Sequence, residues 1–167
     1  RSLPDSVRLV AQFAAAAMAF YQLDILHWDM WWIVLVALVV YVGATNIINF
    51  MDGINGITAG YSLAVLASLA IVNINLHQSA VNLSLIYSTM IAAVVFCLFN
   101  FRPKGRARCF AGDVGSIGIA FIMLFLLGQV IMQTGDITWL IFLLVYGVDG
   151  CFTIMHRIML HENLGEA

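Results

Sequence analysis

The sequence predicts an all-α protein, a polytopic bundle of transmembrane helices with about six spans in this chain. Two properties of the composition predict this class. The chain has 167 residues, of which 63% are hydrophobic and 10% are charged, whereas a soluble domain carries about 25% charged residues. Its mean hydropathy is +0.99, and apolar runs cover nearly the whole length. We therefore interpret residues 1–167 as a single membrane-embedded domain.

Six stretches are candidates for a helix that crosses the hydrocarbon core, which needs about 20 apolar residues. They are approximately 7–23, 31–49, 57–75, 83–101, 114–134 and 138–160. The first is the weakest candidate because it is short and rich in alanine. Short links with turn formers or charges separate the six stretches.

The charged residues of the links show a consistent sidedness. The links after the first, third and fifth spans contain no Lys or Arg, and they hold Asp24, Asp29 and Asp136. All basic residues lie on the other side: Arg1, Arg8, Arg102, Lys104, Arg106, Arg108 and Arg157. The positive-inside rule puts that side in the cytoplasm of an inner-membrane protein. An interfacial aromatic belt on the outer side is indicated by the tryptophans Trp28, Trp31, Trp32 and Trp139.

Several other classes are excluded or disfavoured. A net charge of −2 argues against a nucleic-acid partner. Cys97, Cys109 and Cys151 show no metal-binding spacing and predict no disulfide framework. The sequence starts at Arg1 without a signal peptide and stops at Ala167, so we expect a fragment of a larger protein, truncated at both ends.

A polar series occupies the link between the second and third spans. Its members recur every three positions: Asn46, Asn49, Asp52 and Asn55. Each step of three residues falls about 60° short of a full helical turn, so neighbours in the series share a face. Carboxamides and a carboxylate on one face can bind a metal, a base or a ribose. The alternative is a helix end, because Asn-Gly and Asp-Gly are common in turns.

The link between the fourth and fifth spans is basic, and it precedes a glycine-rich helix start. Its cationic side chains could hold a diphosphate or anionic lipid head groups, although a topology signal explains them as well. Asp113 then opens the fifth span, where it could serve as an N-cap. The glycines at 112, 115 and 118 permit either close approach of a phosphate ligand or close helix packing.

Asp149 lies inside the last predicted span. It is ten residues beyond Trp139 and eight before Arg157, which puts it about 12–15 Å from either boundary at 1.5 Å per residue. A charge at that depth is costly, so an intramembrane carboxylate is a functional hypothesis by default. The alternative is a protonated carboxyl group that is hydrogen-bonded to a neighbouring helix.

Three segments together resemble a known family. The run 46–60 resembles the Asn-x-x-Asp-Gly-x-Asp/Asn-Gly signature of polyprenyl-phosphate N-acetylhexosamine-1-phosphate transferases. The block 100–116 is similar to the Asn…Pro…Phe-Met-Gly-Asp-x-Gly-Ser motif of that family. The segment 147–163, with Gly-Val-Asp, Arg and Glu-Asn, is similar to its last inner-helix segment. The resemblance covers essentially the whole chain.

The resemblance implies a reaction and a set of site residues. The phosphate of undecaprenyl phosphate attacks the β-phosphorus of a UDP-N-acetylhexosamine, and UMP leaves, as the first membrane step of cell-wall or surface polysaccharide (O-antigen) synthesis. The cofactor is Mg²⁺, with Mn²⁺ as the alternative, on the cytoplasmic face. Asp113 is the implied metal ligand, and the catalytic candidates are Asp52, Asp113 and Asp149. The substrate-binding candidates are Asn46, Asn49, Asn55, Asn100, Arg102, Lys104, Arg106 and Arg108. A homodimer is compatible with the sequence, which does not specify the oligomeric state.

The chain departs from the family pattern in four respects. No Asp-Asp pair and no His-x-His segment occur in the sequence, so we expect activity to require the longer protein. Asn occupies position 55, where many members have Asp, and the basic link is longer; both features argue against a pentapeptide-bearing substrate.

Two other readings compete with the transferase. A membrane transporter would use Asp149 as an ion or proton site, but it predicts inverted repeats that the sequence does not show. A structural scaffold explains neither Asp149 nor the polar series.

Overall fold

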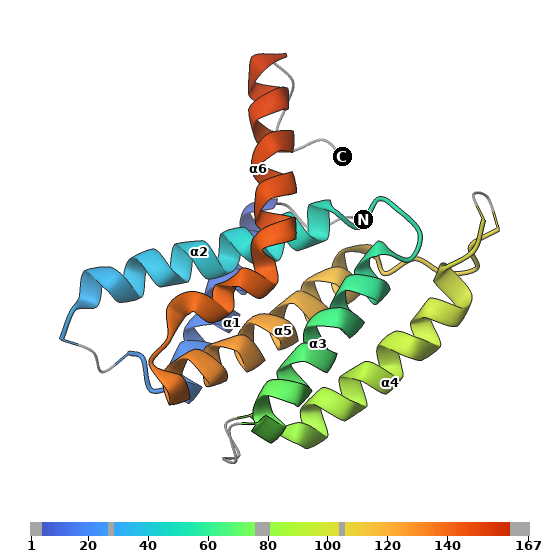
Figure 1. Ribbon diagram of the computed structural model, residues 1–167. Coiled ribbons are helices and arrows are strands. Elements are labelled where there is room, and N and C mark those ends of the chain that lie inside the picture. Colours follow the sequence, from blue (N-terminus) through green and yellow to red (C-terminus); the bar gives the residue numbers. More distant parts are fainter. Residues whose placement is uncertain (1–4, 27–28, 76–80, 104–105, 161–167) are drawn as a thin grey trace.

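The computed structural model describes residues 5–26, 29–75, 81–103 and 106–160, and these form helices and short links (Figure 1). In chain order the elements are α1 (Asp5–Gln22), α2 (Trp31–Phe50), α3 (Ile57–Asn75), α4 (Leu83–Asn100), α5 (Gly112–Thr134), the 3-10 helix η1 (Ile137–Leu143) and α6 (Leu144–Met159). No strand occurs in these residues, so the all-α prediction is confirmed.

Four helices have the length and hydropathy of membrane spans: α2, α3, α4 and α5. They contain 18 to 23 residues, which at 1.5 Å per residue gives about 27–35 Å, close to the thickness of the hydrocarbon core. Their outward faces are apolar, and Val36 and Val39 of α2 are each more than half exposed. Such faces suit lipid or further helices, in keeping with a multi-pass membrane protein. α1, predicted as the weakest span, is not among the four.

The helices pack in pairs around two apolar clusters. α3 packs mainly on α4, α2 on α5, and α1 on α2 (Figure 1). The larger cluster joins α3 to α5 through fully buried side chains such as Leu66, Leu69 and Leu126. The smaller cluster ties α1 to α2, where Phe20 meets Tyr41 edge-on with ring centroids 5.6 Å apart. This packing fixes the ends of α1, α2, α3 and α5 relative to one another.

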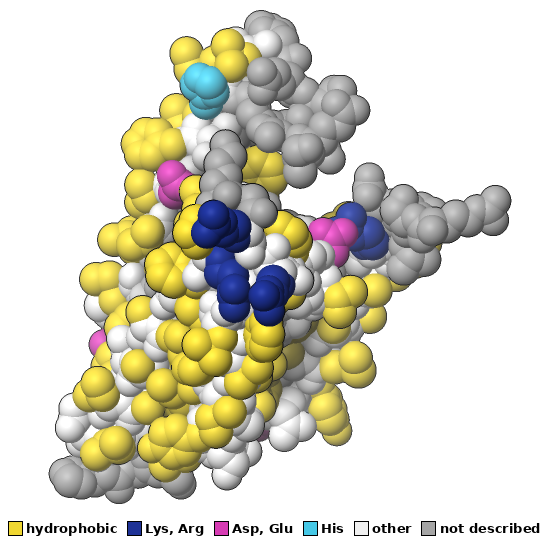
Figure 2. Space-filling model, turned by 90° about the vertical axis from the view of Figure 1, so that its right-hand side faces the viewer, with side chains coloured by type: hydrophobic (Ala, Val, Ile, Leu, Met, Phe, Trp, Pro, Cys, Tyr) yellow, Lys and Arg dark blue, Asp and Glu magenta, His cyan; other side chains and the backbone are white. Residues whose placement is uncertain are grey.

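The two ends of the bundle differ in charge. The end at which α2 and α4 finish and α3 and α5 begin is called here the polar end. The described basic side chains gather there (Figure 2): Arg8, Arg102, Arg106 and Arg108. Asp24, Asp29, Asp136 and the tryptophans Trp31, Trp32 and Trp139 lie toward the opposite end, as the sequence predicted. Arg1, Trp28 and Lys104 lie outside the described residues.

The last predicted span, 138–160, is not one continuous α-helix. Residues 137–143 form η1, in which the carbonyl of Phe142 accepts a hydrogen bond from the Tyr61 hydroxyl of α3. When a side chain donates to a backbone carbonyl in this way, the regular hydrogen bonding of an α-helix is locally interrupted. α6 follows, crosses α2, and its C-terminal half stands clear of the other helices (Figure 1). The helical pattern was predicted, but the break was not.

This break changes the position of Asp149. A 3-10 helix rises about 2.0 Å per residue, so the path from Ile137 to Gly150 is about 25 Å long and spans most of the bundle. Gly150 indeed contacts Ile47 in the last turns of α2, where a Cβ on Gly150 would lie 2.6 Å from Ile47 Cγ2. Asp149 therefore lies near the level of the polar end rather than midway along the spans, contrary to the depth expected from an unbroken helix.

Candidate active site

The predicted residues Asn49 and Asp113 meet at the polar end, although 64 positions separate them in the sequence. Asn49, in the last turn of α2, donates from Nδ2 to Asp113 Oδ1 at 3.4 Å. Its Oδ1 accepts a hydrogen bond from the hydroxyl of Ser116, which is fully buried in the first turns of α5. These two contacts hold the Asn49 carboxamide in one orientation, and they join the first two family-like motifs in a single site.

Asp113 also forms an ion pair with a helix that the motifs do not include. The guanidinium of Arg8, in the first turns of α1, lies 2.9 Å from Asp113 Oδ2. The Asp113 side chain is 60% exposed and that of Arg8 is 32% exposed. The carboxylate therefore faces open space at the polar end, with α1 on one side and α2 on the other.

Asp52 is the second carboxylate of the site. Its Oδ1 accepts a hydrogen bond from the Thr58 hydroxyl of α3, and the backbone amide of Gly112 donates to the same carboxylate. Partial burial raises the pKa of Asp52 above its ordinary value, and these two hydrogen bonds offset part of the rise. The contact joins the turn after α2 to the first residue of α5, which precedes Asp113.

Asn100 connects the link after α2 to the link after α4. It is only 5% exposed, its Oδ1 accepts from the backbone amide of Gly56 at 2.6 Å, and its Nδ2 donates to the Cys109 carbonyl at 2.9 Å. Both ends of the carboxamide are therefore used within the protein. The observed role of this substrate-binding candidate is to hold the two links together.

Replacing Asn100 by Ala is expected to destabilise the protein by about 1–3 kcal/mol, because the half-buried amide of Gly56 and the half-buried carbonyl of Cys109 both lose their partner. The matched control is Asn55→Ala, which removes one hydrogen bond, from Nδ2 to the Arg102 carbonyl at 3.1 Å, at a half-buried position. The control should cost less than about 1 kcal/mol. Thermal unfolding of both variants in detergent measures the difference, and equal losses would contradict the connecting role of Asn100.

The glycine after Asn55 is required by the same junction. Gly56 has a φ of +87°, and a Cβ at this position would lie 2.1 Å from Cδ2 of Phe101. Any side chain there would be strained and would collide with the ring. The Asn-Gly pair thus makes the turn that the sequence indicated, while its neighbours also serve the site.

The other binding candidates lie at different distances from this centre. Asn46, one turn before Asn49, exchanges two hydrogen bonds with Gln12 of α1, at 2.7 and 3.3 Å. Arg102 donates from Nε to the Leu98 carbonyl at 3.2 Å. Arg106 and Arg108 are exposed on the surface of the polar end, and Lys104 lies outside the described residues. The described part of the basic link therefore lies at the polar end, and its hydrogen bonds with Asn55 and the Leu98 carbonyl do not reach Asn49 or Asp113.

The structure does not bring Asp149 into the same cluster. Its side chain is exposed on α6, and no group of three or more His, Cys, Asp or Glu side chains with metal-binding geometry occurs in the described part of the chain. Asp149 shares α6 with two residues that contact the helices of the site. Gly150 packs against Ile47 of α2, and the ring centroid of Tyr146 lies 4.0 Å from that of Tyr61 of α3. His161, Glu162 and Asn163 lie outside the described residues.

Two alternatives from the sequence can now be decided. Asp113 is not an N-cap, because Ala111 occupies that position and Asp113 lies inside the first turn of α5. Helix packing does not account for the glycines at 112 and 118, since a Cβ on either would meet no atom within 4 Å in the described structure. The start of α5 is therefore open on the side of these glycines.

The donor set fits a magnesium ion. Mg²⁺ prefers hard oxygen ligands and is usually held by one or two carboxylates together with water and substrate phosphates. Asp113 supplies an exposed carboxylate, and Asp52, which accepts from the Gly112 amide, is the second candidate ligand. A site built from two carboxylates suits an ion that arrives with a phosphate substrate better than a closed structural site.

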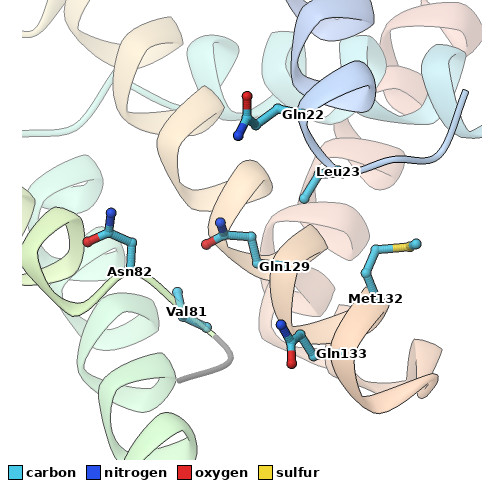
Figure 3. A pocket seen from close by; sticks show the side chains of 7 residues that line it. All are labelled: Gln22, Leu23, Val81, Asn82, Gln129, Met132 and Gln133. Atoms are coloured by element: carbon cyan, nitrogen blue, oxygen red, sulfur yellow. The ribbon is translucent and has the colours of Figure 1, made fainter. Parts of the chain in front are cut away.

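An open cavity of the described structure lies elsewhere. The cavity has a volume of 450 Å³ at the opposite end of the bundle, where α1 and α5 end and α4 begins (Figure 3). Its wall contains four carboxamides and no charged side chain: Gln22, Leu23, Val81, Asn82, Gln129, Met132 and Gln133. It is therefore separate from the carboxylate site.

Comparison with known proteins identifies the family. The sequence model of glycosyl transferase family 4 matches residues 1–131, which include α1 to α4, all but the last three residues of α5 and the whole carboxylate site. This chain belongs to glycosyl transferase family 4. The resemblance of the segments 46–60 and 100–116 is thereby confirmed, whereas the segment 147–163 lies outside the match.

Curated members of family 4 are similar over part of their length. The chain is 35% identical to the phospho-N-acetylmuramoyl-pentapeptide-transferase of Moorella thermoacetica over 60% of this chain and 30% of that protein. It is 33% identical to the probable undecaprenyl-phosphate N-acetylglucosaminyl 1-phosphate transferase of Bacillus subtilis over 71% of this chain and 33% of that protein. The matches thus span about a third of these relatives. No solved structure matches the chain significantly.

Three residues of this family 4 site were missed by the sequence reasoning. Arg8 was assigned only to topology, and Gln12 and Thr58 had no assigned role. Gln12 is the one that a pattern could have revealed, because a carboxamide in an otherwise apolar, alanine-rich helix needs a polar partner. Ser116 lay in a quoted motif, but its contact with Asn49 depends on the pairing of α2 with α5.

Proposed function

We propose that this chain is part of an enzyme that transfers an N-acetylhexosamine-1-phosphate from a UDP-sugar to undecaprenyl phosphate and releases UMP. The observation that carries the proposal is the meeting of Asn49, Asp52 and Asp113 at one end of a family 4 helix bundle. The transfer agrees with the names of the two relatives, and such a reaction would start cell-wall or surface polysaccharide synthesis.

The residues divide the work of bringing two phosphate groups together. Asp113, together with Asp52, would hold Mg²⁺. When bound, this ion would neutralise phosphate charge and stabilise a phosphate leaving group. Asn49 is held by Ser116 and keeps the Asp113 carboxylate in position. The exposed guanidinium groups of Arg106 and Arg108 at the polar end would attract the anionic nucleotide.

A UDP-N-acetylhexosamine without a peptide is the proposed donor. Asn55 uses its carboxamide to hold the Arg102 carbonyl, so the basic link folds back over the end of α2. Asn at position 55 and the length of the basic link support a donor without the pentapeptide. The transporter alternative is not favoured, because the two compared relatives are transferases and Asp149 lies on an exposed face of α6.

An exchange assay on the full-length protein tests the function. Labelled UMP is incubated with unlabelled UDP-sugars and undecaprenyl phosphate, and label in the UDP-sugar reports the reversible transfer. We expect exchange with a UDP-N-acetylhexosamine that requires both Mg²⁺ and the lipid phosphate, and none with the UDP-MurNAc-pentapeptide. No exchange with any donor would contradict the proposed reaction, and exchange with the pentapeptide donor would contradict the proposed substrate.

We also propose that the polar end faces the cytoplasm, with the active site on that side of the inner membrane. The basic side chains at this end motivate the orientation. In a background without the three native cysteines, Asp136→Cys is expected to react with an impermeant thiol reagent added to intact cells. Arg106→Cys should react only after permeabilisation, and the reverse pattern would contradict the proposed orientation.

A further inference from the structure

α1 brings two polar side chains to the site, and they make different kinds of contact. Gln12 exchanges two hydrogen bonds with Asn46 and is 6% exposed. Arg8, one turn earlier, reaches over the end of α2 to the exposed carboxylate of Asp113. The first contact is buried inside the bundle, whereas the second is at the open surface of the polar end.

The ion pair between Arg8 and Asp113 is not needed to hold α1 in place. Water screens a pair of charges that are 32% and 60% exposed, so such pairs add little stability. α1 is instead attached to α2 by the Gln12–Asn46 bonds and by the apolar contacts of Ala16 and Phe20. The ion pair to Asp113 is therefore a minor part of what attaches α1 to the bundle.

A metal ion and Arg8 compete for the same oxygen. Asp113 Oδ2 faces the guanidinium at 2.9 Å, and a cation bound at this carboxylate would repel Arg8 from that oxygen. A diphosphate carried by the metal offers new acceptors within reach of a displaced guanidinium. The planar fork of an arginine matches phosphate oxygens in bidentate geometry.

We propose that Arg8 is a diphosphate-binding residue of the UDP-sugar, which pairs with Asp113 until the metal and the nucleotide enter. The inference rests on the proposed function and adds to it a residue from α1. The Arg8 guanidinium already faces the proposed metal ligand Asp113. Arg102, in contrast, donates to the Leu98 carbonyl in the last turn of α4.

The test measures binding to the full-length enzyme rather than turnover. Three probes are titrated: Mn²⁺ alone by electron paramagnetic resonance, then UDP and uridine at saturating Mn²⁺ by calorimetry. Arg8→Gln removes the charge, Arg8→Lys keeps the charge but not the fork, and Ser6→Ala on the exposed start of the same helix is the control.

We expect Arg8→Gln to weaken UDP by about tenfold or more, the usual loss for one charge-assisted hydrogen bond. Uridine should stay within about twofold, because it carries no phosphate, and Mn²⁺ alone should bind as well as or better than before, because its competitor is gone. Arg8→Lys should fall between Arg8→Gln and the wild type.

Unchanged UDP affinity, equal losses for UDP and uridine, or weaker Mn²⁺ binding in Arg8→Gln would each overturn the role of Arg8. Absence of UDP binding to the wild-type enzyme would instead contradict the proposed function, so the two failures are distinguishable.

Discussion

Asp113→Asn is expected to reduce transfer by at least about a thousandfold, because a metal at a phosphoryl centre supplies several kcal/mol of charge stabilisation. The carboxamide preserves the shape of the side chain and an acceptor for Asn49, but it removes the negative charge. Mn²⁺ affinity should fall together with activity. Stability should change little, since the side chain is 60% exposed and does not cap α5.

A matched carboxylate just beyond the other end of α5 provides the control. Asp136 is fully exposed and accepts a hydrogen bond from the Thr138 backbone amide at 2.8 Å. Asp136→Asn retains an acceptor for that amide and should retain activity and Mn²⁺ affinity. If Asp113→Asn proved as active as Asp136→Asn, the metal role of Asp113 would be wrong.

Asp52→Asn is expected to lower activity by at least about a hundredfold and at the same time to raise the melting temperature slightly at pH 7, on the order of one or two degrees. Partial burial raises the pKa of Asp52 in the folded protein, so the ionised carboxylate costs stability at neutral pH. The neutral amide removes this cost and can still accept the hydrogen bond from Thr58.

The sign of this effect can be checked against pH. A raised folded-state pKa means that the wild type loses stability as pH rises from the ordinary carboxyl pKa through the folded pKa. The advantage of Asp52→Asn should therefore be largest at neutral pH and should vanish in acid, where both side chains are neutral. Thermal unfolding from pH 4 to pH 8 measures it. Thr58→Val, which keeps the charge but removes its donor, should destabilise the protein at pH 7.

The sequence predicted the helices of this protein well because the bilayer imposes a simple rule. An apolar run of about 20 residues followed by a charged link defines α2 to α5 almost to the residue. The same rule did not predict η1, because hydropathy does not distinguish a 3-10 from an α-helical path. The Tyr61 contact to the Phe142 carbonyl depends on how α3 meets the last segment.

The candidate site was predicted in part. The spacing of the polar series predicted one helical face, but α2 ends at Phe50, so Asp52 and Asn55 lie in the turn beyond it. Motif order suggested that Asp113 would join the series, and Asn49 does contact Asp113 while Asp52 contacts Gly112. Arg8 could not be predicted, because its contact depends on which face α1 turns toward α2. The role of Asn100 in joining two links could not be predicted either, because a motif does not show whether a carboxamide faces a ligand or a loop.

The break at η1 has a consequence for how the chain enters the membrane during synthesis. The apolar stretch of Ile137–Thr153 has 17 residues and includes Asp149, so it is a poor signal for independent insertion. α5, in contrast, has 23 residues and a hydropathy of 2.3. A left-handed turn at Gly135 folds η1 directly back from the end of α5. We therefore expect the two segments to insert into the bilayer together as a hairpin, with the strongly apolar α5 favouring the insertion of the segment that contains Asp149.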